Sequence, residues 1–281
     1  MALLDDIEIY PIKSTQGIAL KQSSVQLSGL TGDRRYMLVD ERGQFVTARK
    51  YPVLTQVSST YQPGDQLQLT YSEPDAQVDS QLTINPADFT GDYTDTIIWK
   101  VGVRALLCGE KYDRWFSDIL NKPVRLVYFA EQSSRLANSQ PEKPVAFADS
   151  YPFLIASRAS LNAVAEQCPE PVNIQQFRAN IIVDECEPFA EDSWQRFKIG
   201  DVVFETVSPC VRCSLITVNP ATAERSSIGE PFKTLTKQRM LEENGKKQGP
   251  TFGMNLVALN EGTIRVGDSV EVLEYRTPER Y

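Results

Sequence analysis

A pair of cysteines with an arginine between them is the part of this sequence best suited to chemistry. Cys210, Arg212 and Cys213 occur in the stretch Pro209-Cys-Val-Arg-Cys213, which follows a β-rich run at 202–207. Such a pair can be a redox couple, half of a zinc site, or a soft anchor for a heavier metal. The plainest alternative is that both cysteines are small, buried apolar residues. The rest of the sequence has to separate these interpretations.

Two of the interpretations lack supporting residues. A structural zinc site needs two further thiols at ligand spacing, and Cys108, Cys168 and Cys186 stand alone. A thioredoxin-type couple stands at the start of a helix, whose dipole favours the thiolate, whereas residues 214–218 predict a strand. Zinc binding and thiol redox chemistry are therefore the weaker interpretations.

Positive charges gather at the ends of predicted strands, although the chain is acidic overall, with a formal net charge of −8. They occur in four short stretches: Tyr10-Pro-Ile-Lys-Ser14, Gly29-Leu-Thr-Gly-Asp-Arg-Arg35, Thr47-Ala-Arg-Lys50 and Phe177-Arg-Ala-Asn-Ile-Ile182. Cations concentrated at strand ends favour a pocket for an anionic ligand. Together with a thiol beside Arg212, they predict an anionic cofactor that is held at its phosphate and carries a metal at its other end.

The composition excludes several other classes of function. The 281 residues include no histidine, which removes serine–histidine and cysteine–histidine nucleophiles and histidine-ligated zinc or haem. No stretch approaches the roughly 20 apolar residues that span a bilayer, and the N-terminus has no secretory signal. Five cysteines are a small, odd number that does not suit a disulfide framework. We therefore expect a cytoplasmic protein that binds neither a membrane nor duplex nucleic acid.

The elements that must position these residues are mainly strands. Helices are predicted only at about 109–121, 157–168 and 233–243, among many short alternating runs. The segments 197–204 and 264–272 both consist of a strand, a Gly-Asp turn and a returning strand. Repeated hairpins of this kind predict a small closed β-barrel.

Several longer motifs make the sequence similar to a known family, the MOSC-domain proteins of the YcbX and mitochondrial amidoxime-reducing component type. Besides the four basic stretches and the cysteine pair, they are Tyr36-Met-Leu-Val39, Phe147-Ala-Asp-Ser-Tyr-Pro-Phe-Leu154, Ala190-Glu-Asp-Ser-Trp194 and Thr263-Ile-Arg-Val-Gly-Asp268. The resemblance covers nearly the whole chain. It implies a molybdenum cofactor, which is a pyranopterin dithiolene with a phosphate, and the reduction of N-hydroxylated compounds such as amidoximes and hydroxylamino-purines.

The resemblance also assigns roles to individual residues. It makes Cys213 the thiolate ligand of molybdenum, a soft donor for a metal already bound by sulfur, with Cys210 as a secondary candidate beside the cofactor. The residues expected to hold the pterin and its phosphate are Lys13, Ser14, Arg35, Arg178, Asn180 and Arg212. Weaker expectations are Arg34 and Arg49 as cofactor contacts and Asp149 as a catalytic proton donor.

The fold implied by the resemblance is mainly β (α+β), with a MOSC β-barrel and an associated N-terminal β-rich domain. We place the N-terminal domain at 1–130, with its first ~40 residues packed against the barrel, the MOSC domain at 131–275 and a tail or linker start at 276–281. Some bacterial relatives continue into a ferredoxin-like domain, but this chain has no four-cysteine [2Fe–2S] site. Electrons are therefore expected from a separate iron–sulfur or flavin partner, or from a ferredoxin-like domain that this sequence does not include. The alternatives are a carrier of the cofactor or of sulfur without reductase activity, and a non-catalytic anion-binding β protein.

Overall fold

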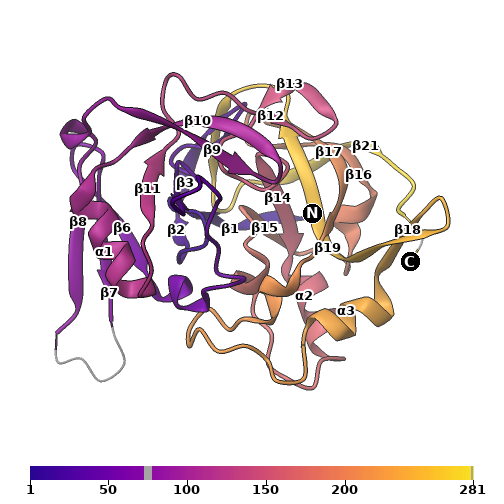
Figure 1. The fold of residues 1–281 in the computed structure, drawn as a ribbon. Helices are drawn as coiled ribbons and strands as arrows, with labels where there is room; N and C mark the ends of the chain where they lie inside the picture. The colour runs from indigo at the N-terminus through magenta and orange to yellow at the C-terminus, as the bar shows by residue number, and fades with distance from the viewer. Residues whose placement is uncertain (73–77, 280) are drawn as a thin grey trace.

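Strands dominate the computed structural model, which describes residues 1–72, 78–279 and 281. This confirms the expected mainly β (α+β) class. In this part of the chain there are three α-helices: α1 (Glu110–Leu120), α2 (Arg158–Ala165) and α3 (Phe232–Gln238). Short 3-10 helices are η1 (Pro52–Gln56), η2 (Pro86–Asp88), η3 (Ile174–Phe177), η4 (Ala190–Ser193) and η5 (Ser214–Thr217). Figure 1 shows β6, β7, β8 and α1 on one side of the molecule and the C-terminal strands on the other.

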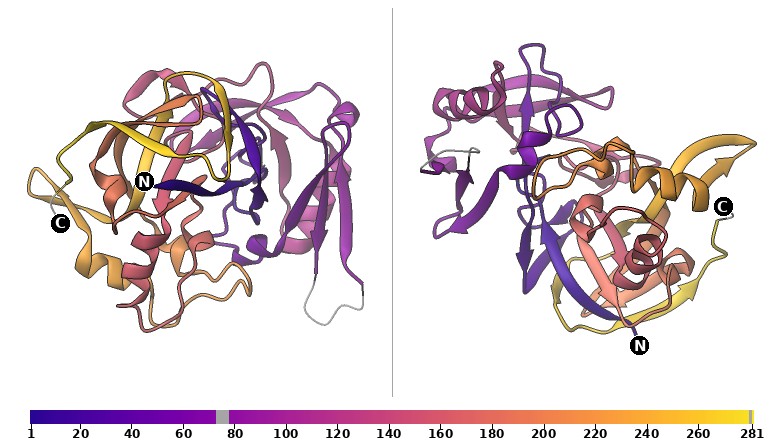
Figure 2. Two further views of the ribbon diagram at one scale, coloured as in Figure 1. Left: turned by 180° about the vertical axis from the view of Figure 1, so that it is seen from behind. Right: turned by 90° about the horizontal axis from the view of Figure 1, so that it is seen from below.

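The largest sheet within the described residues has nine strands and combines both ends of the sequence. Its order is β2 (Ile18–Leu20), β1 (Leu3–Ile9), β15 (Ile181–Asp184), β14 (Phe153–Ser157), β19 (Lys246–Ala258), β17 (Val202–Val211), β16 (Trp194–Ile199) and β21 (Val270–Tyr275), with β18 (Met240–Glu243) paired to β19. The N-terminal strand β1 thus pairs directly with β15. In the view from below, this indigo strand lies among the orange strands of the C-terminal half (Figure 2).

The remaining strands form smaller sheets, most of them from the N-terminal half. A four-stranded sheet has the order β5 (Tyr36–Val39), β11 (Arg125–Tyr128), β10 (Val101–Leu107) and β9 (Tyr93–Ile98). A three-stranded sheet contains β6 (Ser58–Gln62), β7 (Gln66–Tyr71) and β8 (Ser80–Ile84). Short pairings complete the fold: β20 (Gly262–Arg265) with β3 (Gln22–Gln26) and β4 (Gly29–Leu30), and β12 (Leu136–Ala137) with β13 (Gln140–Pro144).

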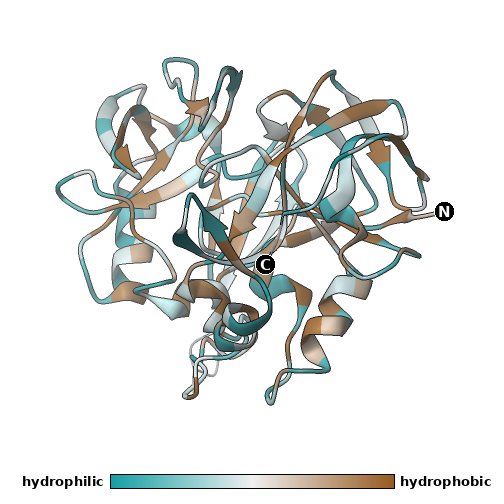
Figure 3. Ribbon diagram, turned by 90° about the vertical axis from the view of Figure 1, so that its right-hand side faces the viewer, coloured by the Kyte–Doolittle hydropathy of each residue, from teal (hydrophilic) through white to brown (hydrophobic). Residues whose placement is uncertain are grey.

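Alternation along the central strands gives the large sheet an apolar core on each face. On β14, Phe153 and Ile155 join one buried cluster, while Leu154 and Ala156 join another with α2 and η3. This follows from the strand period of two, which sends successive side chains to opposite faces. Because helices cover one of those faces, β14 is buried throughout. Figure 3 shows brown apolar segments in the strands and teal polar segments in many of the loops.

The expected closed barrel is wrong in detail, because the large sheet does not close. β2 and β21 stand at the two ends of the strand order. Within the described residues, the chain around β1 meets the turn before β21 and the first residue of β21 through the isolated bridge Leu3–Ser269 and a few backbone hydrogen bonds, such as Leu4 N to Asp268 O at 2.8 Å. Along most of its length β1 pairs instead with β2 and β15, which leaves no continuous ladder to β21.

Two local expectations also need correction. The helix expected at 233–243 ends at Gln238, because residues 240–243 pair with β19 as β18. The strand expected at 214–218 is the 3-10 helix η5, in which Ile216 O accepts a hydrogen bond from the Gln176 side chain at 2.7 Å. The helices expected at 109–121 and 157–168 are present as α1 and α2. The division at residue 130 stays a prediction.

Candidate active site

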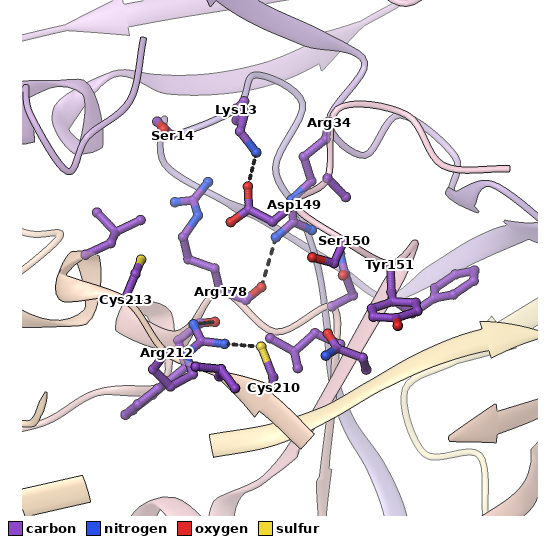
Figure 4. A pocket seen from close by; sticks show the side chains of 18 of the residues that line it. Lys13, Ser14, Arg34, Asp149, Ser150, Tyr151, Arg178, Cys210, Arg212 and Cys213 are labelled. Atoms are coloured by element: carbon purple, nitrogen blue, oxygen red, sulfur yellow. Dashed lines mark hydrogen bonds and ion pairs between the residues drawn. The ribbon is translucent and has the colours of Figure 1, made fainter. Parts of the chain in front are cut away.

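A cavity of about 320 Å³ lies where the large sheet meets the N-terminal half of the chain. Its walls come from the ends of several strands, which is where the sequence placed the cations. Lys13 and Ser14 follow β1, Arg34 precedes β5, and Arg178 and Asn180 precede β15. Figure 4 shows the side chains of Lys13, Arg34 and Arg178 and the two cysteine sulfurs around one space. The fold therefore brings together residues that are up to 200 positions apart in sequence.

All but one of the expected site residues line this cavity. They are Lys13, Ser14, Arg34, Arg49, Asp149, Arg178, Asn180, Cys210, Arg212 and Cys213. The exception is Arg35, whose guanidinium lies over the rings of Tyr128 and Phe129, at 5.4 and 5.3 Å from their centroids, and donates to Phe129 O. Arg34 is the last residue of the turn before β5 and has a left-handed φ of 46°, whereas Arg35 is the residue directly before the strand. This change of backbone conformation sends the two neighbouring side chains in different directions. The structure therefore separates Arg35 from the other cations.

The two cysteines occupy different backbone positions at the cavity wall. Cys210 is the second-last residue of β17, beside a register shift between Pro209 and Val211. Irregularities of this kind re-aim side chains near functional sites. Arg212 Nη1 donates to the Cys210 sulfur at 2.9 Å, and burial raises the pKa of this thiol against the opposing effect of the Arg212 charge. Cys213 lies beyond the strand, as the N-cap residue of η5, and is partly exposed to the cavity.

A buried network beneath the cavity orders two of its arginines. Arg34 forms two hydrogen bonds with Asp33, at 2.7 and 2.9 Å. The guanidinium carbons of Arg34 and Arg178 lie 4.4 and 4.0 Å from the centre of the Tyr10 ring. The Tyr10 hydroxyl in turn donates to Glu8 at 2.5 Å. The two carboxylates and the aromatic ring thus compensate for two guanidinium groups that are close together.

Some donors in this network have no partner within the described residues. Arg178 has a left-handed φ of 56° at the end of η3, and its Nη1 donates to Thr15 O at 2.8 Å. Its Nη2, like Nε of Arg212, is buried and makes no hydrogen bond in that part of the chain. Burial lowers the pKa of Arg178 to about 10, so the group stays charged near neutral pH. Buried donors without an acceptor are costly, and an anionic ligand in the cavity would supply one.

Lys13 and Asp149 form an ion pair at the edge of the cavity. The Lys13 ammonium donates to the Asp149 carboxylate and to Phe147 O, the latter at 2.8 Å. Burial lowers the pKa of Lys13, although the Asp149 charge opposes this effect. Enclosure in the cavity favours neutral Asp149, but the Lys13 charge and hydrogen bonds from Lys13 and Trp99 outweigh it and hold the pKa of Asp149 well below its ordinary value. Asp149 is therefore ionised at neutral pH, which argues against the expected role as a proton donor.

Asn255 and Trp99 are two of the residues at this site that the sequence missed. Asn255 on β19 lines the cavity, and its amide nitrogen donates to Ser208 Oγ at 3.3 Å. Trp99 contacts a lining residue from outside, as its Nε1 donates to Asp149 Oδ1 at 2.9 Å. An asparagine inside a buried apolar strand was a usable signal for the first residue. A tryptophan between two short alternating runs gave no comparable signal for the second.

Comparison with known proteins identifies the family. Residues 1–123 match the MOSC N-terminal beta barrel domain, and residues 142–271 match the MOSC domain. The chain is 34% identical to human mitochondrial amidoxime-reducing component 1 over 94% of its own length and 81% of that protein. Its identity to human mitochondrial amidoxime reducing component 2 is 30%, over 93% of this chain and 81% of the relative. The chain therefore belongs to the MOSC-domain family that includes the amidoxime-reducing components.

These relatives are named as mitochondrial proteins, whereas the sequence led us to expect a cytoplasmic one. The location of this chain stays a prediction. Among the residues that the structure describes, no helix is both long and apolar enough to cross a membrane.

Proposed function

We propose that this protein is a molybdenum-cofactor-dependent reductase of N-hydroxylated compounds, such as amidoximes and hydroxylamino-purines. The relatives named as amidoxime-reducing components support this activity. The observation that carries the proposal is the set of donors in the cavity. It combines the thiols of Cys210 and Cys213 with the guanidinium groups of Arg212, from the same segment, and of Arg178, from another. Arg178 Nη2 and Arg212 Nε are buried and make no hydrogen bond within the described residues. These groups fit a ligand with a soft metal at one end and a phosphate at the other.

The residues divide by chemistry into a metal side and an anion side. Cys213 would be the metal ligand, and Cys210 would lie beside it with its sulfur hydrogen-bonded to Arg212. The side chains that would hold the pterin and its phosphate are Lys13, Ser14, Arg34, Arg178, Asn180 and Arg212. Arg49, at the mouth, would be a peripheral contact. When bound, the cofactor supplies the two-electron chemistry that cleaves an N–O bond.

Reduction of an amidoxime consumes two electrons and two protons, and gives an amidine and water. Since Asp149 is ionised, we infer that it holds Lys13 and accepts hydrogen bonds, while the protons come from water. The electrons would come from a separate iron–sulfur or flavin protein. The purified chain should therefore be inactive with NAD(P)H alone and active with a chemically reduced dye, which needs no docking partner.

The test is to produce the protein in a host that makes the cofactor and to measure molybdenum and pterin per chain. Amidoxime reduction is then assayed with the reduced dye. About one molybdenum per chain with turnover supports the proposal. Stoichiometric cofactor without turnover would favour the carrier alternative, and protein without cofactor would favour a non-catalytic anion-binding role. Direct NAD(P)H-driven turnover would contradict the assigned electron route.

A further inference from the structure

The turn between β9 and β10 places an aromatic side chain against two residues that line the cavity, Asp149 and Arg49. Trp99 and Lys100 are the two loop residues, since Ile98 pairs with Val101. Both loop residues have left-handed backbone angles, with φ of 50° and 73°. Two-residue hairpin turns with positive φ at both positions favour Asn-Gly, because bulkier residues are strained there. A tryptophan in this position indicates that its side chain has a role that outweighs the strain.

The indole contacts two charged residues of the cavity wall. Its Nε1 donates to Asp149 Oδ1 at 2.9 Å, and its ring lies 4.3 Å from the guanidinium carbon of Arg49. Phe45 supports the indole, with the ring centroids 5.2 Å apart. Trp99 nevertheless keeps 41% of its surface exposed. The turn therefore presents a partly exposed aromatic surface beside two charged residues that line the cavity.

The size of the cavity determines what can reach this surface. About 320 Å³ is near the lower limit for pockets that hold a drug-sized ligand. If the proposed cofactor occupies the space between Lys13 and Cys213, it takes up much of this volume, and a substrate has to extend toward the opening. Tyr151 is an aromatic residue of the cavity lining, and Trp99 lies behind the lining residues Asp149 and Arg49, which it contacts.

We propose that Trp99 is a specificity-determining residue, whose exposed indole stacks on the conjugated part of an N-hydroxylated substrate. This inference rests on the proposed function and adds a preference for flat aromatic substrates over aliphatic ones. Aromatic pairs of this kind contribute beyond simple burial, and the expected preference is about three- to tenfold in kcat/KM.

The test uses benzamidoxime and acetamidoxime, which share the reacting group and differ only in a phenyl or a methyl substituent. Wild type should prefer benzamidoxime, mainly through KM. Trp99→Leu should lose about three- to tenfold of that preference, while Trp99→Phe should keep most of it. Lys100→Ala, at the exposed neighbouring position of the same turn, is the matched control and should not change the ratio. An unchanged ratio in Trp99→Leu would overturn the inference.

A second variant separates specificity from a structural role. The double substitution Trp99→Asn, Lys100→Gly suits the turn, so it should raise Tm while lowering the substrate ratio. If the substrate ratio stays at the wild-type value while only Tm changes, Trp99 is a turn residue and the inference fails.

Failure of the proposed function is recognised separately, as absence of turnover with either amidoxime in molybdenum-loaded protein. Binding then decides the inference through tryptophan fluorescence. Benzamidoxime should quench the emission more strongly than acetamidoxime in wild type, and this difference should vanish in Trp99→Phe. Equal quenching by the two compounds in wild type would overturn the inference.

Discussion

Two thiol-bearing regions of this molecule differ in what surrounds the sulfur. Cys108, between β10 and α1, is 1% exposed in a cluster of apolar side chains that includes Tyr112 and Phe116. Burial, with a smaller contribution from Asp113, raises its pKa well above the ordinary value. Cys210 is half-buried at the cavity wall, where a guanidinium donates to its sulfur and Cys213 stands close by in sequence.

The difference shows that burial alone does not prepare a thiol for metal chemistry. An apolar environment keeps the proton on sulfur, whereas a metal ligand has to be a thiolate. Around Cys213, the cavity supplies cations from four segments of the chain, together with partial exposure. We therefore expect substitutions in the two regions to affect different observables.

The largest effect, on reductase activity, should come from replacing a cysteine by serine in each region. Cys213→Ser replaces a soft donor by a hard one, and reductase activity should fall by more than about a hundredfold. Cys210→Ser should reduce activity less. Cys108→Ser is the control from the apolar region and should keep the turnover per bound molybdenum near wild type. If Cys210→Ser is inactive and Cys213→Ser active, the metal ligand has been assigned to the wrong cysteine.

Substitutions in the apolar region should lower the free energy of unfolding and leave the activity unchanged. Phe116 is fully buried on α1 and packs beside Trp115. Phe116→Ala leaves a cavity, and the free energy of unfolding should fall by about 3–5 kcal/mol. Urea titration measures this loss, while turnover per molybdenum of the folded protein should not change. A large loss of specific activity would show that the two regions are coupled.

Two arginine substitutions compare the cavity with its surroundings through a smaller effect, on cofactor binding. Arg178→Ala removes a charge that faces the cavity, and should weaken cofactor binding by about ten- to a hundredfold, since a charge-assisted hydrogen bond contributes about 1.5–3 kcal/mol. Arg35→Ala should leave the occupancy unchanged, because its guanidinium packs on Tyr128 and Phe129. Pterin content measured at limiting cofactor separates the two. Reduced occupancy in Arg35→Ala alone would contradict the geometry.

Much of this contrast could be predicted from the sequence, because residue type and local spacing determine it. The basic stretches, the cysteine pair and the family resemblance identified ten of the residues that line the cavity, whereas others, such as Thr47, Tyr151 and Asn255, were not expected there. The sequence did not show in which direction each side chain points. The sequence contains Arg34 and Arg35 side by side, but only the backbone at the start of β5 decides which one faces the cavity.

The other differences arise from contacts between distant parts of the chain. Residues 214–218 have a strand-like composition, yet the side chain of Gln176 takes the carbonyl of Ile216 and a 3-10 helix forms. Trp99 stands in a turn whose usual residues are Asn and Gly, so local rules gave it no role. The pairing of β1 with β15 spans most of the sequence and likewise has no local signal.

The smallest effects concern the pH dependence of stability. They should come from two aspartates, Asp149 at the cavity and Asp113 in the apolar region. The pKa of Asp149 is held below its ordinary value by Lys13 and Trp99, despite its enclosure. Burial instead raises the pKa of Asp113, which stands on α1 near Cys108. The folded state therefore binds a proton more weakly than the unfolded chain at Asp149, and more strongly at Asp113.

These shifts have opposite consequences for stability. Ionised Asp149 contributes stability above an ordinary aspartate pKa of 3.8, and this contribution is lost as the pH falls below it. Ionised Asp113 lowers the stability of the folded state above the same pKa, and protonation of Asp113 removes this cost as the pH falls. Since the Asp149 side chain is 59% exposed, solvent screening limits its contribution to about 1 kcal/mol or less.

The measurement is the unfolding free energy of wild type, Asp149→Asn and Asp113→Asn by urea titration between pH 7 and pH 3. Relative to Asp149→Asn, wild type should lose stability as the pH falls below about 4. Relative to Asp113→Asn, it should gain stability as the pH approaches 4 from above, because the folded protein takes up the proton first. The two difference curves should therefore have slopes of opposite sign. Parallel curves would mean that the two carboxyl groups share one kind of environment, and the contrast between the cavity and the apolar region would fail at its most local test.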